Sequence, residues 1–207
     1  MCCDICFEGV YMNRLILVNK DNILTKTYIP RDLIIDPKSG KELNKDTHKA
    51  FTNMNKAMDN QGLSKLVLVS AYRPYDYQEK VFTRKVNGLM KEGLSKTDAI
   101  DKAKTIVALP GTSEHQTGLA IDITNQDLNK QKDPLIEEFE NTIHAKWLRD
   151  NAHKYGFILR YPKGKTNITH ISYEPWHYRY VGIYHANEIK KRGMCLEEYI
   201  SHIDKKQ

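Results

Sequence analysis

Residues 113–124 read Ser-Glu-His-Gln-Thr-Gly-Leu-Ala-Ile-Asp-Ile-Thr, and the second half of this stretch decides the fold. Between Gly118 and Ile123, large apolar residues alternate with small or acidic ones. This period of two predicts a half-buried β-strand, because successive side chains of a strand point to opposite faces. One predicted face is apolar and consists of Leu119, Ile121 and Ile123, and the other consists of Gly118, Ala120 and Asp122.

Helices and a second strand are predicted before this strand. Apolar residues at helical spacing indicate a first helix over about 47–60, and the run at 66–69 indicates a buried strand. A second, longer helix follows, and Ser95 with Asp98 has the spacing of a cap for a third, short one. The long helix is predicted to carry on one face Phe82, Val86, Leu89 and Met90.

Further elements are predicted after the central strand. An amphipathic helix closes at Tyr155-Gly156, and strands at 157–159 and 178–181 form a candidate hairpin. The apolar positions that define this helix are Ile136, Phe139, Ile143 and Trp147.

The irregular order of strands and helices predicts one α+β domain over residues 1–207, with a central, mainly antiparallel sheet flanked by helices. We expect residues 1–45 to form an irregular lead-in. Turn residues at Pro30, Pro37 and Gly40 interrupt this lead-in, and only Leu15–Val18 reads as a short strand within it.

Composition and charge narrow the functional class. Of 207 residues, 40% are hydrophobic and 28% are charged, which is ordinary for a soluble globular protein and excludes a disordered or fibrous one. The formal net charge is +6, and this excess is spread along the chain. The densest clusters, at 190–192 and at the terminal Lys205-Lys206, fit a solvated helix face better than a nucleic-acid patch, so we expect no nucleic-acid partner.

Targeting signals and cysteines add two expectations. No stretch approaches the ~20 apolar residues of a membrane helix, and the N-terminal region lacks the pattern of a signal peptide. We therefore expect no membrane span and a cytoplasmic location, or an extracytoplasmic one if the chain is a fragment without its leader. Cys3-x-x-Cys6 has no second pair to complete a metal site, so we expect reduced thiols at all four cysteines, Cys2, Cys3, Cys6 and Cys195.

Two short segments carry candidate chemistry. His115 precedes Asp122 by seven residues, and Asp122 lies on the small-residue face of the strand, where a metal or ligand can approach closely. In Glu174-Pro175-Trp176-His177, a Glu and a His lie three residues apart. Two His and one Asp would give three ligands to Zn²⁺ and leave a fourth position for water, as in hydrolytic zinc sites. Glu174 would then be free to act as a general base.

Together these segments resemble a known family. Ser113–Asp122 matches the pattern S-x-H-x-x-G-x-A-x-D of the zinc D,D-peptidases related to VanX and VanY at every fixed position. Glu174–His177 matches their second metal segment, and Ser70–Arg73 is similar to their arginine segment. The resemblance covers residues 60–200, and the stretches 107–110 and 155–162 look most like the VanXY type of vancomycin-resistance enzymes.

The resemblance implies a role for each matching residue. One zinc ion per chain would be bound by His115, Asp122 and His177. Glu174 would be the catalytic base, and Arg73 would stabilise the substrate carbonyl and the oxyanion that develops from it. Contacts to the substrate would come from Ser113, which holds its C-terminal carboxylate, and from Gln78, with Tyr72 and Trp176 as walls of the site.

The resemblance also implies a hedgehog/D,D-peptidase fold and a zinc hydrolase that removes D-Ala from small peptides ending in D-Ala-D-Ala. Such a D,D-carboxypeptidase or D,D-dipeptidase would clear normal cell-wall precursors in a vancomycin-resistant bacterium. One alternative on the same zinc site is an L,D-carboxypeptidase or a peptidoglycan endopeptidase. Another is a non-catalytic, hedgehog-like zinc domain, which the presence of Glu174 and Arg73 disfavours. The sequence leaves the oligomeric state open.

Overall fold

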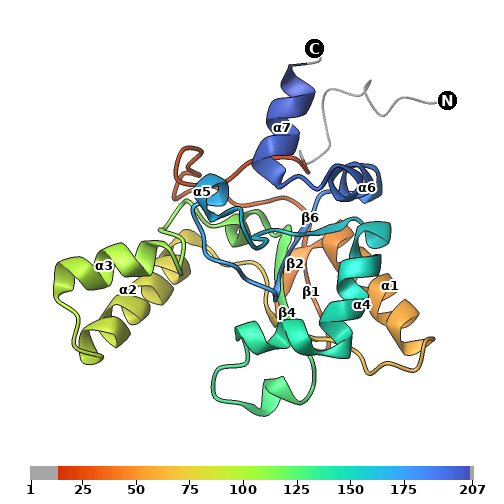
Figure 1. The fold of residues 1–207 in the computed structure, drawn as a ribbon, viewed down its shortest axis with the longest axis horizontal. Helices are drawn as coiled ribbons and strands as arrows, with labels where there is room; N and C mark the ends of the chain where they lie inside the picture. Colours follow the sequence, from red (N-terminus) through yellow and green to blue (C-terminus); the bar gives the residue numbers. More distant parts are fainter. Residues whose placement is uncertain (1–13, 206–207) are drawn as a thin grey trace.

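The structure, a computed structural model, describes residues 14–205 (Figure 1). Its centre is a four-stranded antiparallel sheet in the order β3-β4-β6-β5, and a smaller antiparallel sheet pairs β1 with β2. The α+β class with an antiparallel centre is thus confirmed. The strands are β1 (Leu33–Ile35), β2 (Glu42–Asn44), β3 (Val67–Ser70), β4 (Ala120–Thr124), β5 (Phe157–Leu159) and β6 (His177–Tyr180).

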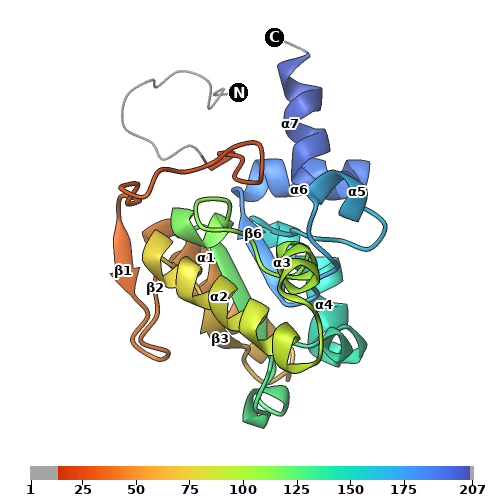
Figure 2. The ribbon, with the colours of Figure 1, turned by 90° about the vertical axis from the view of Figure 1, so that its left-hand side faces the viewer.

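The helices flank this sheet on different sides. α1 (Lys45–Asp59) and α4 (Ile143–Asn151) pack on the central sheet through the largest apolar core, whereas α2 (Tyr75–Lys91) and α3 (Lys96–Lys104) form a projecting hairpin (Figures 1 and 2). Near the end of the chain, α6 (Ile183–Arg192) and α7 (Leu196–Asp204) share a second core. The short helices are η1 (Glu114–Thr117), η2 (Leu128–Lys130), η3 (Glu137–Asn141), η4 (Ala152–Tyr155) and α5 (Thr166–Thr169).

The largest core forms on the apolar face that the alternating stretch predicts. Leu119, Ile121 and Ile123 are fully buried and pack with side chains of α1 and α4. The expectation that the strand is half-buried is wrong, because all five residues of β4 are buried. β4 has a hydrogen-bonded neighbour on each edge, and the side chains of the candidate site cover the face that carries Asp122.

Most predicted elements are present near their expected positions. The first helix is α1, the buried strand is β3, and the hairpin is formed by β5 with β6. The predicted cap is also present, since the Ser95 hydroxyl accepts a hydrogen bond from the backbone N–H of Asp98 at 3.1 Å. Local signals of periodicity and capping therefore suffice for these elements.

Three expectations about the helices and the lead-in need correction. Met90 is 40% exposed, although Val86 and Leu89 on the same helix are buried. The helix expected from Ile136 to Tyr155 is divided into η3, α4 and η4, because Thr142 caps a new helix with its hydroxyl. The lead-in is not irregular throughout, because it contains the short β1–β2 hairpin.

Leu15–Val18 does not form the predicted strand. The segment packs apolar side chains against two cores. Its backbone carbonyl groups accept hydrogen bonds from an arginine side chain and not from a neighbouring strand. Arg179 Nη2 donates hydrogen bonds to the carbonyl oxygens of Arg14 and Ile16, at 2.9 and 2.8 Å. A short apolar run without a partner strand was therefore a misleading signal here.

The cysteine and membrane expectations are tested only in part. Cys2, Cys3 and Cys6 lie outside the described residues, and Cys195 is a buried free thiol at the start of α7. Burial raises the pKa of the Cys195 thiol to about 11, so the thiol stays protonated at neutral pH. Within residues 14–205, no helix has both the length and the apolar character to cross a membrane.

Candidate active site

The short helix η1 carries His115 and directly precedes β4, an inner strand of the central sheet. Gly118 ends this helix with φ +70° and turns the chain into β4. A side chain at Gly118 would meet both Leu33 and the backbone nitrogen of Asn44, so this turn requires glycine for its φ and for its space. The glycine of the motif therefore sets the distance between His115 and Asp122.

Sheet register brings the remaining candidate metal ligands together. Asp122 of β4 and His177 of β6 are paired in register, and Asp122 Oδ1 lies 2.9 Å from His177 Nδ1. The other carboxylate oxygen, Oδ2, lies 3.1 Å from His115 Nε2. All three residues are buried, and their potential ligand atoms lie within 4.8 Å of one another. The donor set of two imidazoles and one carboxylate suits a catalytic zinc site.

A hydrogen bond assigns the ring nitrogen that His115 offers to a metal. His115 Nδ1 lies 2.6 Å from the carbonyl oxygen of Ala71, which can only accept, so Nδ1 carries the proton and Nε2 is free to bind a metal. Burial and the nearby Arg73 guanidinium lower the pKa of His115 to about 4, so its ring is neutral at pH 7. For His177, Nδ1 faces Asp122 Oδ1, a carboxylate oxygen that accepts a hydrogen bond, so this nitrogen carries a proton when no metal is bound.

Glu174 and Arg73 lie beside these three residues. A Glu174 carboxylate oxygen is 3.5 Å from His177 Nδ1, and 14% of the Glu174 side chain is exposed. Burial, with a further contribution from the Asp122 carboxylate, raises the pKa of Glu174 to about 8. The Arg73 guanidinium is close enough to oppose that rise and to lower the pKa of His115. A carboxyl of raised pKa beside a fixed cation suits proton transfer next to a developing negative charge.

The predicted substrate residues lie on several elements of the structure. Ser113 is buried directly before η1, and Tyr72 follows β3 and is half-buried. The side-chain nitrogen of Gln78 donates to the carbonyl oxygen of Ala108 at 2.7 Å, while its oxygen is buried without a hydrogen-bond partner among the described residues. Trp176 packs against the largest core. Their contacts with a substrate remain predictions.

Three charged residues of the site were missed by the sequence analysis. Glu114 is fully buried next to His115, and its Oε1 accepts hydrogen bonds from Arg160 and Arg179, both at 2.7 Å. Burial alone would raise the pKa of Glu114, but the two guanidinium groups outweigh burial and hold that pKa far below its ordinary value. Glu114 lies inside the quoted motif, but nothing in the sequence pattern places the two arginines beside it.

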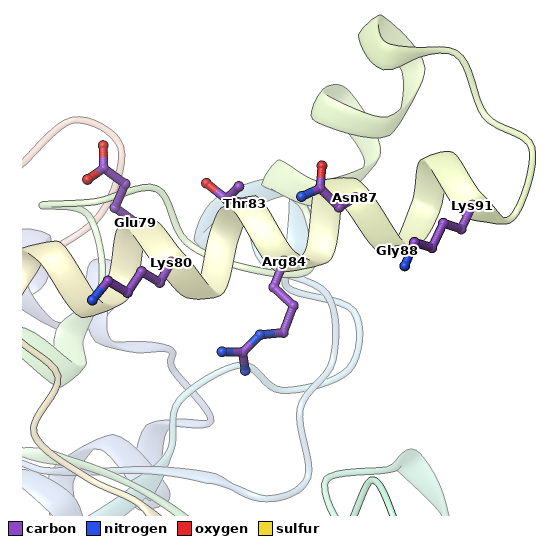
Figure 3. A pocket seen from close by; sticks show the side chains of 7 residues that line it. All are labelled: Glu79, Lys80, Thr83, Arg84, Asn87, Gly88 and Lys91. Atoms are coloured by element: carbon purple, nitrogen blue, oxygen red, sulfur yellow. The ribbon is translucent and has the colours of Figure 1, made fainter.

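A separate hollow lies along α2, away from this centre. Figure 3 shows its lining, with Lys80 and Arg84 on the opposite side of the helix from Glu79. None of its lining residues is a predicted site residue. They are Glu79, Lys80, Thr83, Arg84, Asn87, Gly88 and Lys91.

The family profile and several curated relatives that match this chain are described as D-alanyl-D-alanine carboxypeptidases. The profile of the VanY family, D-alanyl-D-alanine carboxypeptidases, matches residues 40–183. Among curated relatives, the bifunctional D-Ala-D-Ala dipeptidase and D-Ala-D-Ala carboxypeptidase VanXYC of Enterococcus gallinarum is 39% identical over 197 residues, which cover 93% of this chain and 96% of the relative. The chain spans about two thirds, 69% and 65%, of the length of two other curated relatives.

Solved structures agree with the family match. The vancomycin-resistance D,D-pentapeptidase VanY of a VanB-type cassette, solved in complex with Zn(II), superposes with a TM-score of 0.78 at 35% identity, over 91% of this chain and 99% of that one. The LD-carboxypeptidase LdcB superposes with a TM-score of 0.76 at 41% identity, over 89% and 84% of the two chains.

Proposed function

The chain belongs to the VanY family of D-alanyl-D-alanine carboxypeptidases, and from this premise we propose that it is a zinc-dependent D,D-peptidase of the vancomycin-resistance type. Its reaction is the removal of D-Ala from peptides that end in D-Ala-D-Ala. One observation carries the proposal: the buried ligand atoms of His115, Asp122 and His177 converge next to the Glu174 carboxyl group. Such a centre fits hydrolysis of a peptide bond.

The three converging residues are the proposed ligands of one Zn²⁺ ion. His115 would bind it through Nε2, His177 through Nδ1, and Asp122 through its carboxylate. The fit rests on the donor set and on His115 Nε2, a buried nitrogen that makes no hydrogen bond among the described residues. When bound, zinc supplies Lewis-acid polarisation of the scissile carbonyl and makes the attacking water more acidic.

Glu174 and Arg73 perform the proton and charge steps of the proposed mechanism. Glu174 accepts the proton of the attacking water and passes it to the leaving amine of D-Ala. Burial raises the pKa of Glu174 to about 8 in the metal-free site. The charge of bound zinc would lower that pKa and favour the carboxylate, which is the form that accepts the proton. The Arg73 guanidinium stabilises the negative charge that develops on the carbonyl oxygen.

Four further residues are proposed to bind and orient the substrate at the zinc site. In the proposal, the Ser113 hydroxyl binds the C-terminal carboxylate of the substrate, and Gln78 contacts the peptide through its unpartnered side-chain oxygen. Tyr72 and Trp176 form walls of the site. Both the free dipeptide and a longer precursor peptide are proposed substrates, in line with the two activities in the name of the Enterococcus gallinarum relative.

A second candidate is an L,D-carboxypeptidase, since the chain is 41% identical to LdcB, a higher identity than to the VanY structure. Both activities use the same zinc chemistry and differ in the configuration of the residue before the scissile bond. The substrate therefore has to be tested on peptides that end in D-Ala and carry either a D- or an L-residue before the scissile bond.

The deciding experiment measures D-Ala release by the zinc-loaded protein from D-Ala-D-Ala, from a precursor-like peptide ending in D-Ala-D-Ala, and from the same peptide shortened to end in L-Lys-D-Ala. We expect release from the first two substrates, loss of release with a chelator, and recovery when zinc is added back. Release from the L-Lys-D-Ala peptide alone would establish the L,D-activity instead. Full turnover in the presence of the chelator would contradict the zinc mechanism.

A further inference from the structure

Two buried polar atoms next to the proposed zinc site face each other without a hydrogen bond. Glu114 Oε2 and His177 Nε2 lie 3.9 Å apart, and neither has a hydrogen-bond partner among the described residues. Both side chains are almost completely buried, at 0% and 4% exposure. Leaving a buried carboxylate oxygen and a buried imidazole nitrogen unpaired is costly, so a small rotation that joins them is favourable.

The Glu114 carboxylate is held in one orientation by cations on its other oxygen. Arg160 Nε and Arg179 Nη1 both donate to Oε1, at 2.7 Å, which leaves Oε2 directed at His177. The arginines are anchored in turn. Arg160 makes two hydrogen bonds to the Glu197 carboxylate of α7, at 2.9 and 2.6 Å. Arg179 is tied through Nη2 to backbone carbonyls of the N-terminal segment.

The opposite side of the His177 ring faces the metal ligands. Its Nδ1 lies 2.9 Å from Asp122 Oδ1, while Nε2 is the nitrogen directed at Glu114. A neutral imidazole has one protonated nitrogen and one free nitrogen, so a partner that accepts from Nε2–H leaves Nδ1 free to bind a cation. The Tyr161 ring, 4.8 Å from the His177 ring centre, limits rotation of the imidazole.

We propose that Glu114 is a positioning residue for the zinc site: its Oε2 accepts the Nε2–H of His177 and so presents Nδ1 to the metal. This inference rests on the proposed zinc function. Arg160 and Arg179 keep the Glu114 carboxylate charged and hold Oε2 towards His177. Glu197 contacts Arg160 only through the two Nη atoms, which make no hydrogen bond to Glu114. Carboxylate partners of this kind orient a ligating imidazole and increase its basicity.

The first test compares Glu114→Gln with the matched control Glu197→Gln. In Glu114→Gln, the guanidinium groups of Arg160 and Arg179 attract the new amide oxygen. The amide NH₂ group then faces His177 Nε2–H, and no hydrogen bond can form because both groups are donors. Competition with a chelator should show a zinc Kd raised by about 10- to 100-fold in Glu114→Gln. Glu197→Gln removes a carboxylate from the same arginine but leaves Oε2 in place, so its zinc Kd should equal that of the wild type.

Equal zinc affinities in wild type and Glu114→Gln would overturn the inference while leaving the zinc site intact. Equal weakening in both variants would also overturn it, because the cluster would then act only through the stability of the fold. A wild-type protein that binds no zinc would overturn the proposed function together with this inference.

A measurement on the wild type covers the case in which Glu114→Gln does not fold. Nitrogen-15 NMR of the zinc-loaded protein, with labelled histidines, identifies the protonated nitrogen of the His177 ring. We expect a slowly exchanging proton on Nε2 and a metal-bound Nδ1. A proton on Nδ1, or an Nε2 without a proton, would overturn the inference.

Discussion

Asp122 and His177 are register partners on neighbouring antiparallel strands, and their carboxylate oxygen and ring nitrogen lie 2.9 Å apart although 55 residues separate them in the sequence. The other oxygen of Asp122 faces His115 Nε2 at 3.1 Å. One buried carboxylate thus lies between two imidazoles. Backbone pairing of β4 with β6 therefore positions two of the three proposed metal ligands, and η1 carries the third.

Replacement of Asp122 by Ala should abolish tight zinc binding. The variant loses a ligand and leaves two imidazoles without their shared carboxylate, so the zinc Kd should rise by more than the roughly 10- to 100-fold typical of residues outside the ligand shell. Chelator competition measures this change. An unchanged Kd would exclude Asp122 as a ligand.

Replacement of Arg73 by Ala should separate catalysis from metal binding. Because the guanidinium acts on charge that develops in the reaction, kcat should fall by about 10²- to 10³-fold. Arg73→Lys should recover only part of the rate, since an ammonium lacks the planar donor geometry. Steady-state kinetics with zinc content measured in parallel provide the test. A loss of zinc equal to the loss of rate would contradict this role.

Zinc affinity should increase with pH between about 7 and 9. Burial alone lowers the pKa of His177, but Asp122 and Glu114 outweigh burial and raise this pKa to about 9 in the metal-free protein. Zinc must therefore displace a proton at pH 7. Calorimetry in buffers of different ionisation enthalpy should detect proton release at pH 7 that disappears above pH 9. Zinc binding without proton release at pH 7 would contradict this assignment.

The same pKa gives the sign of a stability change in the metal-free protein. A histidine whose pKa is raised by folding stabilises the fold below its unfolded value of about 6.5, and this contribution is lost as the pH rises through the folded pKa. The free energy of unfolding should thus fall between pH 7 and pH 9. Denaturant titrations at fixed pH values measure it, and His177→Gln should remove this part of the slope.

Replacement of Gly118 by Ala should destabilise the protein by at least about 1–2 kcal/mol, the cost of a left-handed conformation for a residue with a Cβ. The new Cβ would also lie 3.0 Å from Leu33 Cδ2 and 3.1 Å from the Asn44 nitrogen. Gly88→Ala provides a matched control, because nothing lies within 4 Å of its new Cβ and its φ is not positive. Equal thermal stability of the two variants would contradict the steric argument.

The sequence predicted those features that depend on residues close together in the chain, such as strand alternation and helix capping. The alternation at 118–123 placed Leu119 and Ile121 in the core, and Ser95 capped its helix as expected. The strand predicted at Leu15–Val18 is absent, because a strand needs a partner strand and the local sequence does not show whether one is present. Met90 was misplaced for a related reason, since the neighbours that decide burial come from distant segments.

The candidate site was predictable where a motif fixes it and not where distant pairing builds it. His115 and Asp122 belong to one continuous pattern, and His177 follows a recognisable second segment. Arg160 and Arg179 meet Glu114 only through the packing of β5, β6 and η1, so their spacing in the sequence carries no signal. The resemblance supplied the ligand roles, and sheet register explains their geometry.

The central claim is that zinc and Glu174 together hydrolyse a D-Ala-D-Ala terminus. The most direct measurement is D-Ala release from D-Ala-D-Ala by zinc-loaded wild type and zinc-loaded Glu174→Gln, with bound zinc quantified in both samples. We predict equal zinc content, rapid release by the wild type, and a large loss of kcat in the variant. Wild-type turnover by Glu174→Gln, or no release by zinc-bound wild type, would contradict the account.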